Sequence, residues 1–95
     1  MAKNRSDILD DAKCKVCGPR EAQYGDPRIM FNCVSRMFQD YTYLIEKTDR
    51  CWVAQDAIAT QILLKIARLA VDPTHKDSWV DIAGYAALGG ELSGE

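Results

Sequence analysis

Apolar side chains recur every three or four residues along most of this chain, and this spacing restricts the fold more than any other feature. In the stretch 27–47, for example, Met30, Val34, Phe38 and Ile45 keep the helical spacing. No stretch shows the alternation of apolar and polar residues that is typical of a half-buried strand. The sequence therefore predicts an all-α fold.

Capping residues set the bounds of the first two predicted helices. Ser6 can cap a first helix over about 6–16, because a side-chain oxygen at that position accepts a hydrogen bond from the first turn. Asp26 followed by Pro27 predicts the start of a second helix, which continues to about Lys47.

Two further helices follow a polar break at 48–51. The third is expected to end near Ala70, because Pro73 cannot continue it. The fourth is expected over about 77–88, where the glycine pair 89–90 is predicted to end it. The predicted architecture is thus four helices with short connections.

The size of the chain predicts a single domain that associates with copies of itself. The 95 residues form one domain, with an ordered core over about 6–90. A chain this short buries only about 60% of its unfolded surface, and self-association would hide more apolar area. We therefore expect a homo-oligomer.

Charge and hydropathy exclude two classes of partner. The net charge is −2, with 12 basic and 14 acidic residues and no run of like charge, so polymeric DNA or RNA is not expected as a partner. The longest strongly apolar stretch, 62–71, contains Lys65 and Arg68, and it is far shorter than the roughly 20 residues of a membrane span. Because no apolar signal region follows Met1, we expect a cytoplasmic protein.

The four cysteines give only a weak metal signal. Cys14 and Cys17 have the C-x-x-C spacing of zinc and redox sites, but Cys33 and Cys51 lie alone inside apolar helical patterns. The single histidine, His75, is far along the chain. We therefore predict buried thiols and no bound metal.

Asp81 is the charge that most needs an explanation. It is the only charged residue in the run 79–88, which is apolar nearly all round and therefore predicts a helix enclosed by others. A carboxylate in such surroundings must be paired, metal-bound or protonated. Asp77 lies one turn earlier and Tyr85 one turn later, so one face of this helix would present both carboxylates.

The third helix offers the matching cations. Lys65 and Arg68 are three residues apart, and Gln61 lies one turn before Lys65 on the same side. The simplest packing places these cations opposite Asp77 and Asp81. Arginine binds phosphate oxygens with two hydrogen bonds and lysine adds a point charge, so we predict a site for a phosphate-bearing nucleotide.

Four alternatives stay open. Arg68 and Asp81 could form a buried ion pair that only fixes helix register. Tyr24 could stack on a base or pack against the helices, and His75 could bind the ligand or simply lie in a polar loop. The chain as a whole could be a structural oligomer without a small ligand.

Three short stretches carry a family resemblance. Residues 23–27 read QYGDP, residues 64–69 read LKIARL, and residues 75–85 read HKDSWVDIAGY. With these motifs the chain resembles a small phage and prophage family of unassigned function, over roughly 8–92. That family is similar to the MazG-like all-α nucleoside triphosphate pyrophosphohydrolases, so the resemblance implies an oligomeric four-helix MazG-like bundle in the host cytoplasm.

The chain departs from the acidic motifs of the MazG-like enzymes. Those enzymes carry E-x-x-E on one helix and E-x-x-D on the next, which hold magnesium against a triphosphate. Here Lys65 and Arg68 replace the first acidic pair, and Asp77 and Asp81 are what is left of the second. We therefore expect a binder without a cofactor that sequesters a nucleotide, such as a signalling nucleotide of a host's antiviral defence.

A magnesium-dependent pyrophosphohydrolase is the alternative that the resemblance implies. In that case Asp77 and Asp81 would hold the metal. One more carboxylate would complete that site, and the candidates are Glu21, Asp26 and Asp56.

Overall fold

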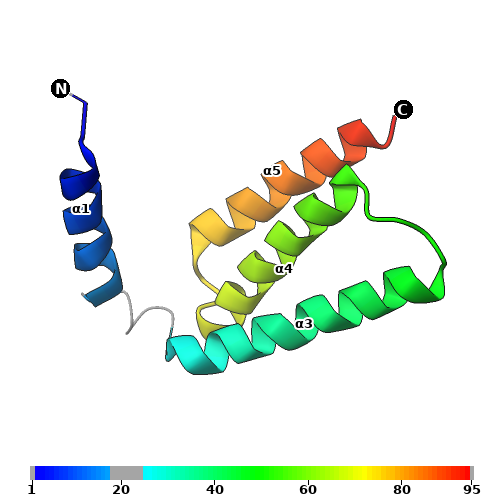
Figure 1. Cartoon of the computed structure of the whole chain (residues 1–95), viewed down its shortest axis with the longest axis horizontal. Coiled ribbons are helices and arrows are strands. Elements are labelled where there is room, and N and C mark those ends of the chain that lie inside the picture. The colour runs from blue at the N-terminus through cyan, green and yellow to red at the C-terminus, as the bar shows by residue number, and fades with distance from the viewer. Residues whose placement is uncertain (1, 18–24, 95) are drawn as a thin grey trace.

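The structure is a computed structural model that describes residues 2–17 and 25–94, and within these residues every regular element is an α-helix. The four helices are α1 (Arg5–Cys17), α3 (Pro27–Lys47), α4 (Ala54–Val71) and α5 (Lys76–Leu92). Figure 1 shows α4 and α5 side by side, with α3 crossing beneath one end of the pair. For the described residues, the prediction of four helices is therefore confirmed.

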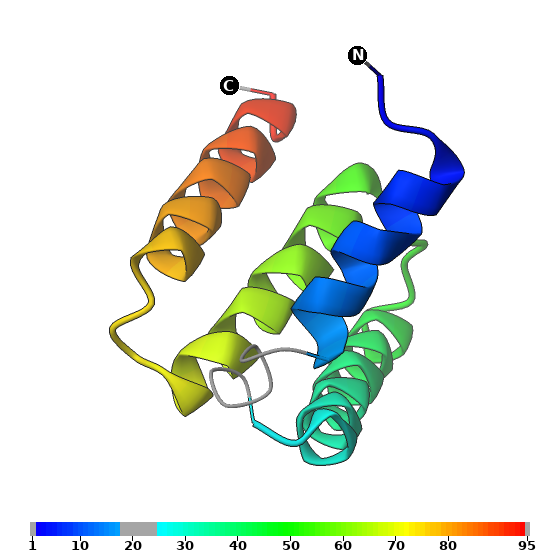
Figure 2. The ribbon, with the colours of Figure 1, turned by 90° about the vertical axis from the view of Figure 1, so that its left-hand side faces the viewer.

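Helix α1 lies apart from α3, α4 and α5 in Figure 1, and Figure 2, which views the molecule from that side, shows it in front of α4. Its cap is Asn4, whose side-chain oxygen accepts a hydrogen bond from the backbone N–H of Asp7 at 2.9 Å. The predicted cap, Ser6, lies inside the helix instead. All of its side chains are exposed, because no other helix covers the face that carries Ile8 and Leu9.

Helix α3 begins where the sequence predicted. The Asp26 carboxylate accepts a hydrogen bond from the backbone N–H of Arg28 at 2.9 Å, and Pro27 occupies the first helical position. The helix ends at Lys47 with Thr48 as its C-cap, and Asp49 in the turn that follows has a φ of 54°.

Helices α4 and α5 form an antiparallel pair, because only four residues, 72–75, connect them. The predicted end of α5 is wrong. The helix continues through Gly89 and Gly90 to Leu92, and Ser93 forms its C-cap. Each glycine inside a helix costs about 1 kcal/mol relative to alanine, but the packing of α5 on α4 offsets that cost.

The buried core is small. Among the described residues the buried apolar side chains are Val34, Ile45 and Leu69. The chain exposes 7400 Å², whereas a folded monomer of 10.6 kDa exposes about 5500 Å². Much apolar surface is therefore open to solvent.

Helix α5 shows where part of this surface lies. Ser78, Asp81, Ile82, Tyr85 and Gly89 are shielded against α4, and the opposite side of the helix is exposed. The expectation that other helices enclose α5 was therefore wrong. None of the helices described here combines the length and the apolar character needed to cross a bilayer.

Candidate functional site

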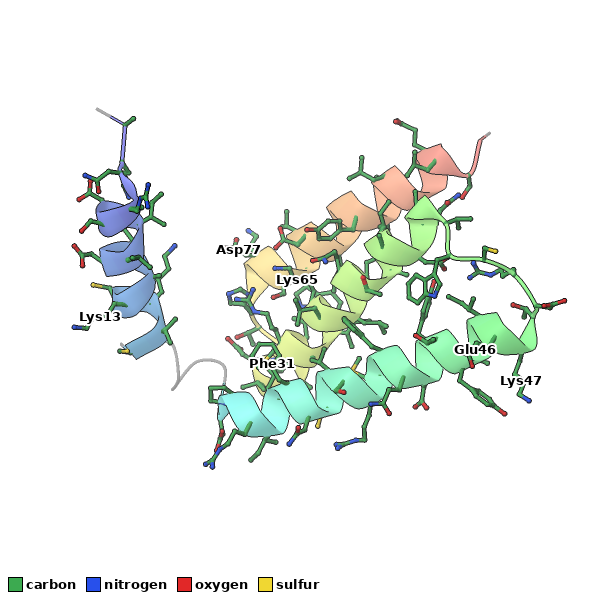
Figure 3. The ribbon with its side chains drawn as sticks, viewed as in Figure 1. Lys13, Phe31, Glu46, Lys47, Lys65 and Asp77 are labelled. Atoms are coloured by element: carbon green, nitrogen blue, oxygen red, sulfur yellow. The ribbon has the colours of Figure 1, made fainter. Side chains whose placement is uncertain are left out.

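The predicted cations and carboxylates lie on the two helices that form the antiparallel pair. Lys65 and Arg68 belong to α4, and Asp77 and Asp81 belong to α5. Figure 3 shows Lys65 and Asp77 toward the end of the pair that carries the 72–75 connection. We call these four residues the α4/α5 charge cluster.

The 72–75 connection holds the two helices in this arrangement. The Asp72 carboxylate accepts hydrogen bonds from the backbone N–H of Thr74 at 3.1 Å and from its hydroxyl at 2.7 Å. These bonds lower the pKa of Asp72. The indole N–H of Trp79 donates to the carbonyl of Pro73 at 2.9 Å, which ties the first turn of α5 to the connection.

An ion pair joins the two helices inside the cluster. The Lys65 ammonium lies 3.1 Å from a carboxylate oxygen of Asp81. The Lys65 side chain is only 16% exposed, whereas that of Asp81 is 45% exposed. The partner of Asp81 is thus the lysine, and the carboxylate reaches solvent rather than a dry interior.

The other two members lie one turn away on each helix. Arg68 follows Lys65 on α4 and is half-buried, with its Nε atom shielded from solvent. Asp77 precedes Asp81 on α5 and is exposed. The cluster therefore consists of two shielded cations on α4 and two carboxylates on α5 that solvent reaches, joined by the Lys65–Asp81 ion pair.

The remaining predicted ligand residues take different positions. Gln61 is exposed on α4, one turn before Lys65, and Tyr85 is half-buried on α5, one turn after Asp81. His75 is the N-cap of α5, where its Nδ1 accepts a hydrogen bond from the backbone N–H of Ser78 at 3.2 Å. Tyr24 lies outside the described residues.

Among the described residues, the carboxylates proposed to complete a magnesium site, Asp26 and Asp56, do not join Asp77 and Asp81. Asp26 caps α3, and Asp56 is buried at the start of α4 with other partners. Within residues 2–17 and 25–94, no three His, Cys, Asp or Glu side chains form a group that could hold a metal ion. Glu21 lies outside the described residues.

The predicted burial of the thiols is wrong. Cys14 and Cys17 on α1 and Cys51 before α4 are exposed, and Cys33 on α3 is half-buried. The apolar spacing around Cys33 correctly indicated a helix. It did not indicate which face of that helix packs against another helix, and this packing decides whether a thiol is buried.

A buried cluster around Asp56 escaped the sequence analysis. The Asp56 residue is only 1% exposed, although it lies in the first turn of α4. Arg50 donates two hydrogen bonds to its carboxylate, at 2.7 and 2.8 Å, and the backbone N–H of Val53 donates another at 2.7 Å. The hydroxyl of Tyr41 on α3 donates the fourth.

These contacts tie the 48–53 segment and α3 to the start of α4. The Arg50 bonds, and after them those from Tyr41 and Val53, hold the pKa of Asp56 well below its ordinary value. Burial, and then the hydrogen bond to Asp56, raises the pKa of Tyr41. The Tyr41 ring also packs on Trp52, with ring centroids 5.7 Å apart. All four donors to Asp56 come from the protein, so the cluster is structural.

A hollow of about 400 Å³ between α3 and α4 is apolar. Ile29 and Met37 of α3 and Ile66 and Val71 of α4 contribute to its walls, and Asp26 is the one charged residue among the described residues that line it. Because those described residues include no cation, they do not suit a phosphate.

Comparison with known proteins places the chain in a family. Residues 7–93 match a family described as "Domain of unknown function (DUF6378)". The Gene 55 protein of Mycobacterium phage D29 is 36% identical over 80 residues, which are 83% of this chain and 48% of that protein. The Gene 55 protein of Mycobacterium phage L5 is 35% identical over 81 residues, 85% of this chain and 49% of that protein.

These matches confirm the predicted similarity to a phage family. The chain spans about half the length of the two Gene 55 proteins. No solved structure matches it. The helices that carry the α4/α5 charge cluster lie entirely inside the matched range, and the chain belongs to the DUF6378 family.

Proposed function

We propose that this protein binds a phosphate-bearing nucleotide at the α4/α5 charge cluster and keeps it intact. The observation that carries the proposal is the position of Lys65, whose shielded ammonium faces the half-exposed carboxylate of Asp81. Arg68 adds a second shielded cation one turn along α4. Two cations so placed suit a group with several anionic oxygens.

The ion pair can exchange its anion for a phosphate. An ion pair with an exposed partner contributes only about 0 to 1 kcal/mol. A phosphate carries more charge than Asp81 and offers several acceptor oxygens, so it competes well for Lys65. Arg68 would bind the same phosphate with two hydrogen bonds. Gln61, one turn before Lys65 on α4, and Tyr85, one turn after Asp81 on α5, could contact the rest of the nucleotide.

The proposal also covers the oligomeric state, the relation to the MazG-like enzymes and the place of action. A homo-oligomer is supported by the 7400 Å² of exposed surface, and a distant relation to the MazG-like bundle is supported by the helical layout. The phage relatives support action in the host cytoplasm. The ligand class that we propose is a signalling nucleotide of the host's antiviral defence.

A magnesium-dependent pyrophosphohydrolase is the second candidate. It is favoured by Asp77 and Asp81, which lie on consecutive turns of α5. Magnesium is commonly bound by one or two carboxylates together with the phosphates of the substrate. In that case the metal would enter with the nucleotide, and Lys65 and Arg68 would contact the triphosphate.

Equilibrium dialysis tests the binding proposal. The full chain is dialysed in EDTA against nucleoside triphosphates, cyclic nucleotides and ADP-ribose-type nucleotides. At least one should bind, and Lys65→Ala or Arg68→Ala should weaken it by about 1.5 to 3 kcal/mol, roughly 10-fold to 150-fold.

The matched control is Lys13→Ala, which removes the same charge from the exposed surface of α1. This variant should bind as the wild type does. If neither Lys65→Ala nor Arg68→Ala changes the binding of any nucleotide, the cluster is a structural ion-pair network and the proposal fails.

A further inference from the structure

The exposed side of α5 carries residues at positions that are symmetric about its middle. Ala83 and Gly84 lie at its middle, with Val80 and Ala87 one turn further out on either side. Lys76 and Glu91 lie at the two ends. All six residues are exposed, and Val80 is 58% exposed.

These six residues lie on one face of the helix. At 100° per residue they cluster around the direction opposite to the side that packs on α4. Figures 1 and 2 show α5 at the edge of the molecule, with α4 on one side of it. The face is therefore open to a partner.

The charges at the two ends oppose the dipole of their own helix. Lys76 lies at the N-terminus of α5, where a negative charge is favoured, and Glu91 lies near the C-terminus, where a positive charge is favoured. Within residues 2–17 and 25–94 neither of them forms an ion pair. About 22 Å of helix separates them, so they cannot pair within one chain.

We infer that α5 pairs with the α5 helix of a second copy in the antiparallel direction, about a two-fold axis between Ala83 and Gly84. Lys76 of each copy then faces Glu91 of the other, and Val80 faces Ala87. Each charge also comes to the helix end that favours its sign.

The sizes of the side chains fit this pairing. The small residues Ala83, Gly84 and Ala87 allow the two helix axes to approach to about 8 Å. A Cβ added at Gly84 would meet no atom within 4 Å apart from its chain neighbours and the backbone of its own helix, so the space above it is free for the partner. Trp79 and Leu88, which are 55% and 53% exposed, flank the face and would extend the contact.

The same pattern favours a second copy over another protein. A two-fold contact requires one surface to be complementary to itself, residue for residue. This face meets that requirement in both charge and size about a single point. The inference is independent of nucleotide binding, and it gives a location to the homo-oligomer that the large exposed surface supports.

Charge reversal tests the inference by sedimentation equilibrium on the full chain. Wild type should form dimers. Lys76→Glu and Glu91→Lys should each weaken the dimer about tenfold, because two symmetry-related contacts change from attractive to repulsive. An equal mixture of the two variants should regain most of the lost affinity, because both ion pairs in the mixed dimer again join opposite charges.

The controls separate this result from loss of folding. Each reversal improves the charge at its own helix end, so circular dichroism should show an intact α5. Lys13→Glu on α1 and Glu46→Lys on α3 make the same charge changes at exposed sites elsewhere (Figure 3), and both should dimerise as wild type does. Ala83→Glu, which places like charges across the axis, should abolish the dimer.

Two results would overturn the inference. If Lys76→Glu, Glu91→Lys and Ala83→Glu all leave the dimer unchanged, the dimer uses another face. The α5 pairing would then be wrong, although the protein would still be a homo-oligomer. If the wild type stays monomeric up to high micromolar concentration, both the α5 pairing and the homo-oligomer are wrong. The exposed face of α5 would then be a binding surface for a different protein.

Discussion

Tyr41→Phe tests whether the buried cluster around Asp56 holds α3 against α4. The change removes one hydroxyl and keeps the ring on Trp52. A hydrogen bond to a charged group contributes about 1.5 to 3 kcal/mol. Because Asp56 keeps its bonds from Arg50 and Val53, we expect a loss of about 2 kcal/mol.

Urea unfolding followed by circular dichroism measures this loss. With a slope of about 1 to 2 kcal/mol per M, the midpoint should fall by about 1 to 2 M. Wild type and variant must be compared at one protein concentration, because self-association adds to apparent stability.

Tyr43→Phe is the matched control, because it removes the same hydroxyl two residues away from a side chain that is 56% exposed. Its midpoint should stay within about 0.5 kcal/mol of wild type. If Tyr41→Phe also unfolds at the wild-type midpoint, the hydrogen bond to Asp56 does not hold the helices together and the reasoning is refuted.

Three further predictions concern the pH dependence of stability and the two ends of α5. Because its pKa in the folded state lies below the unfolded value of about 3.9, Asp56 stabilises the fold fully above about pH 4 and loses that contribution as pH falls further; the urea midpoint should drop there, and a drop just as steep in Asp56→Asn would contradict this. Gly90→Ala should raise the free energy of unfolding by about 0.5 to 1 kcal/mol, because a side chain there meets nothing within 4 Å; a lower melting temperature would count against it. His75→Ala should cost about 1 kcal/mol in thermal melts, since it removes the cap that accepts from Ser78, and an unchanged melt would show that the cap is dispensable.

Local chemistry predicted the start of α3 but not the end of α5. Asp26 and Pro27 act within one turn, so the sequence alone located the start of α3. The pair 89–90 was misread because glycine ends a helix only when no packing stabilises the next turn, and that packing comes from α4. The end of α5 was thus decided by tertiary contacts.

The sequence indicated the α4/α5 charge cluster but not the buried cluster around Asp56. Asp81 stood out because its own helix is apolar, and its partner Lys65 lies on the neighbouring helix in sequence. Asp56 showed no such contrast, although an acidic residue in a first helical turn is a capping signal. Its burial depends on Tyr41, 15 residues earlier, and on the path of the chain between them, which no local pattern predicts.

The central claim is that Lys65 and Arg68 capture a nucleotide without changing it. The direct measurement is to incubate the protein with the nucleotide that binds, with and without magnesium, then to denature the protein and identify what is released by mass spectrometry. The account predicts intact nucleotide in both cases, in amounts equal to the sites filled. Steady conversion to a monophosphate and pyrophosphate that requires magnesium, and that Asp77→Ala or Asp81→Ala abolishes, would contradict it.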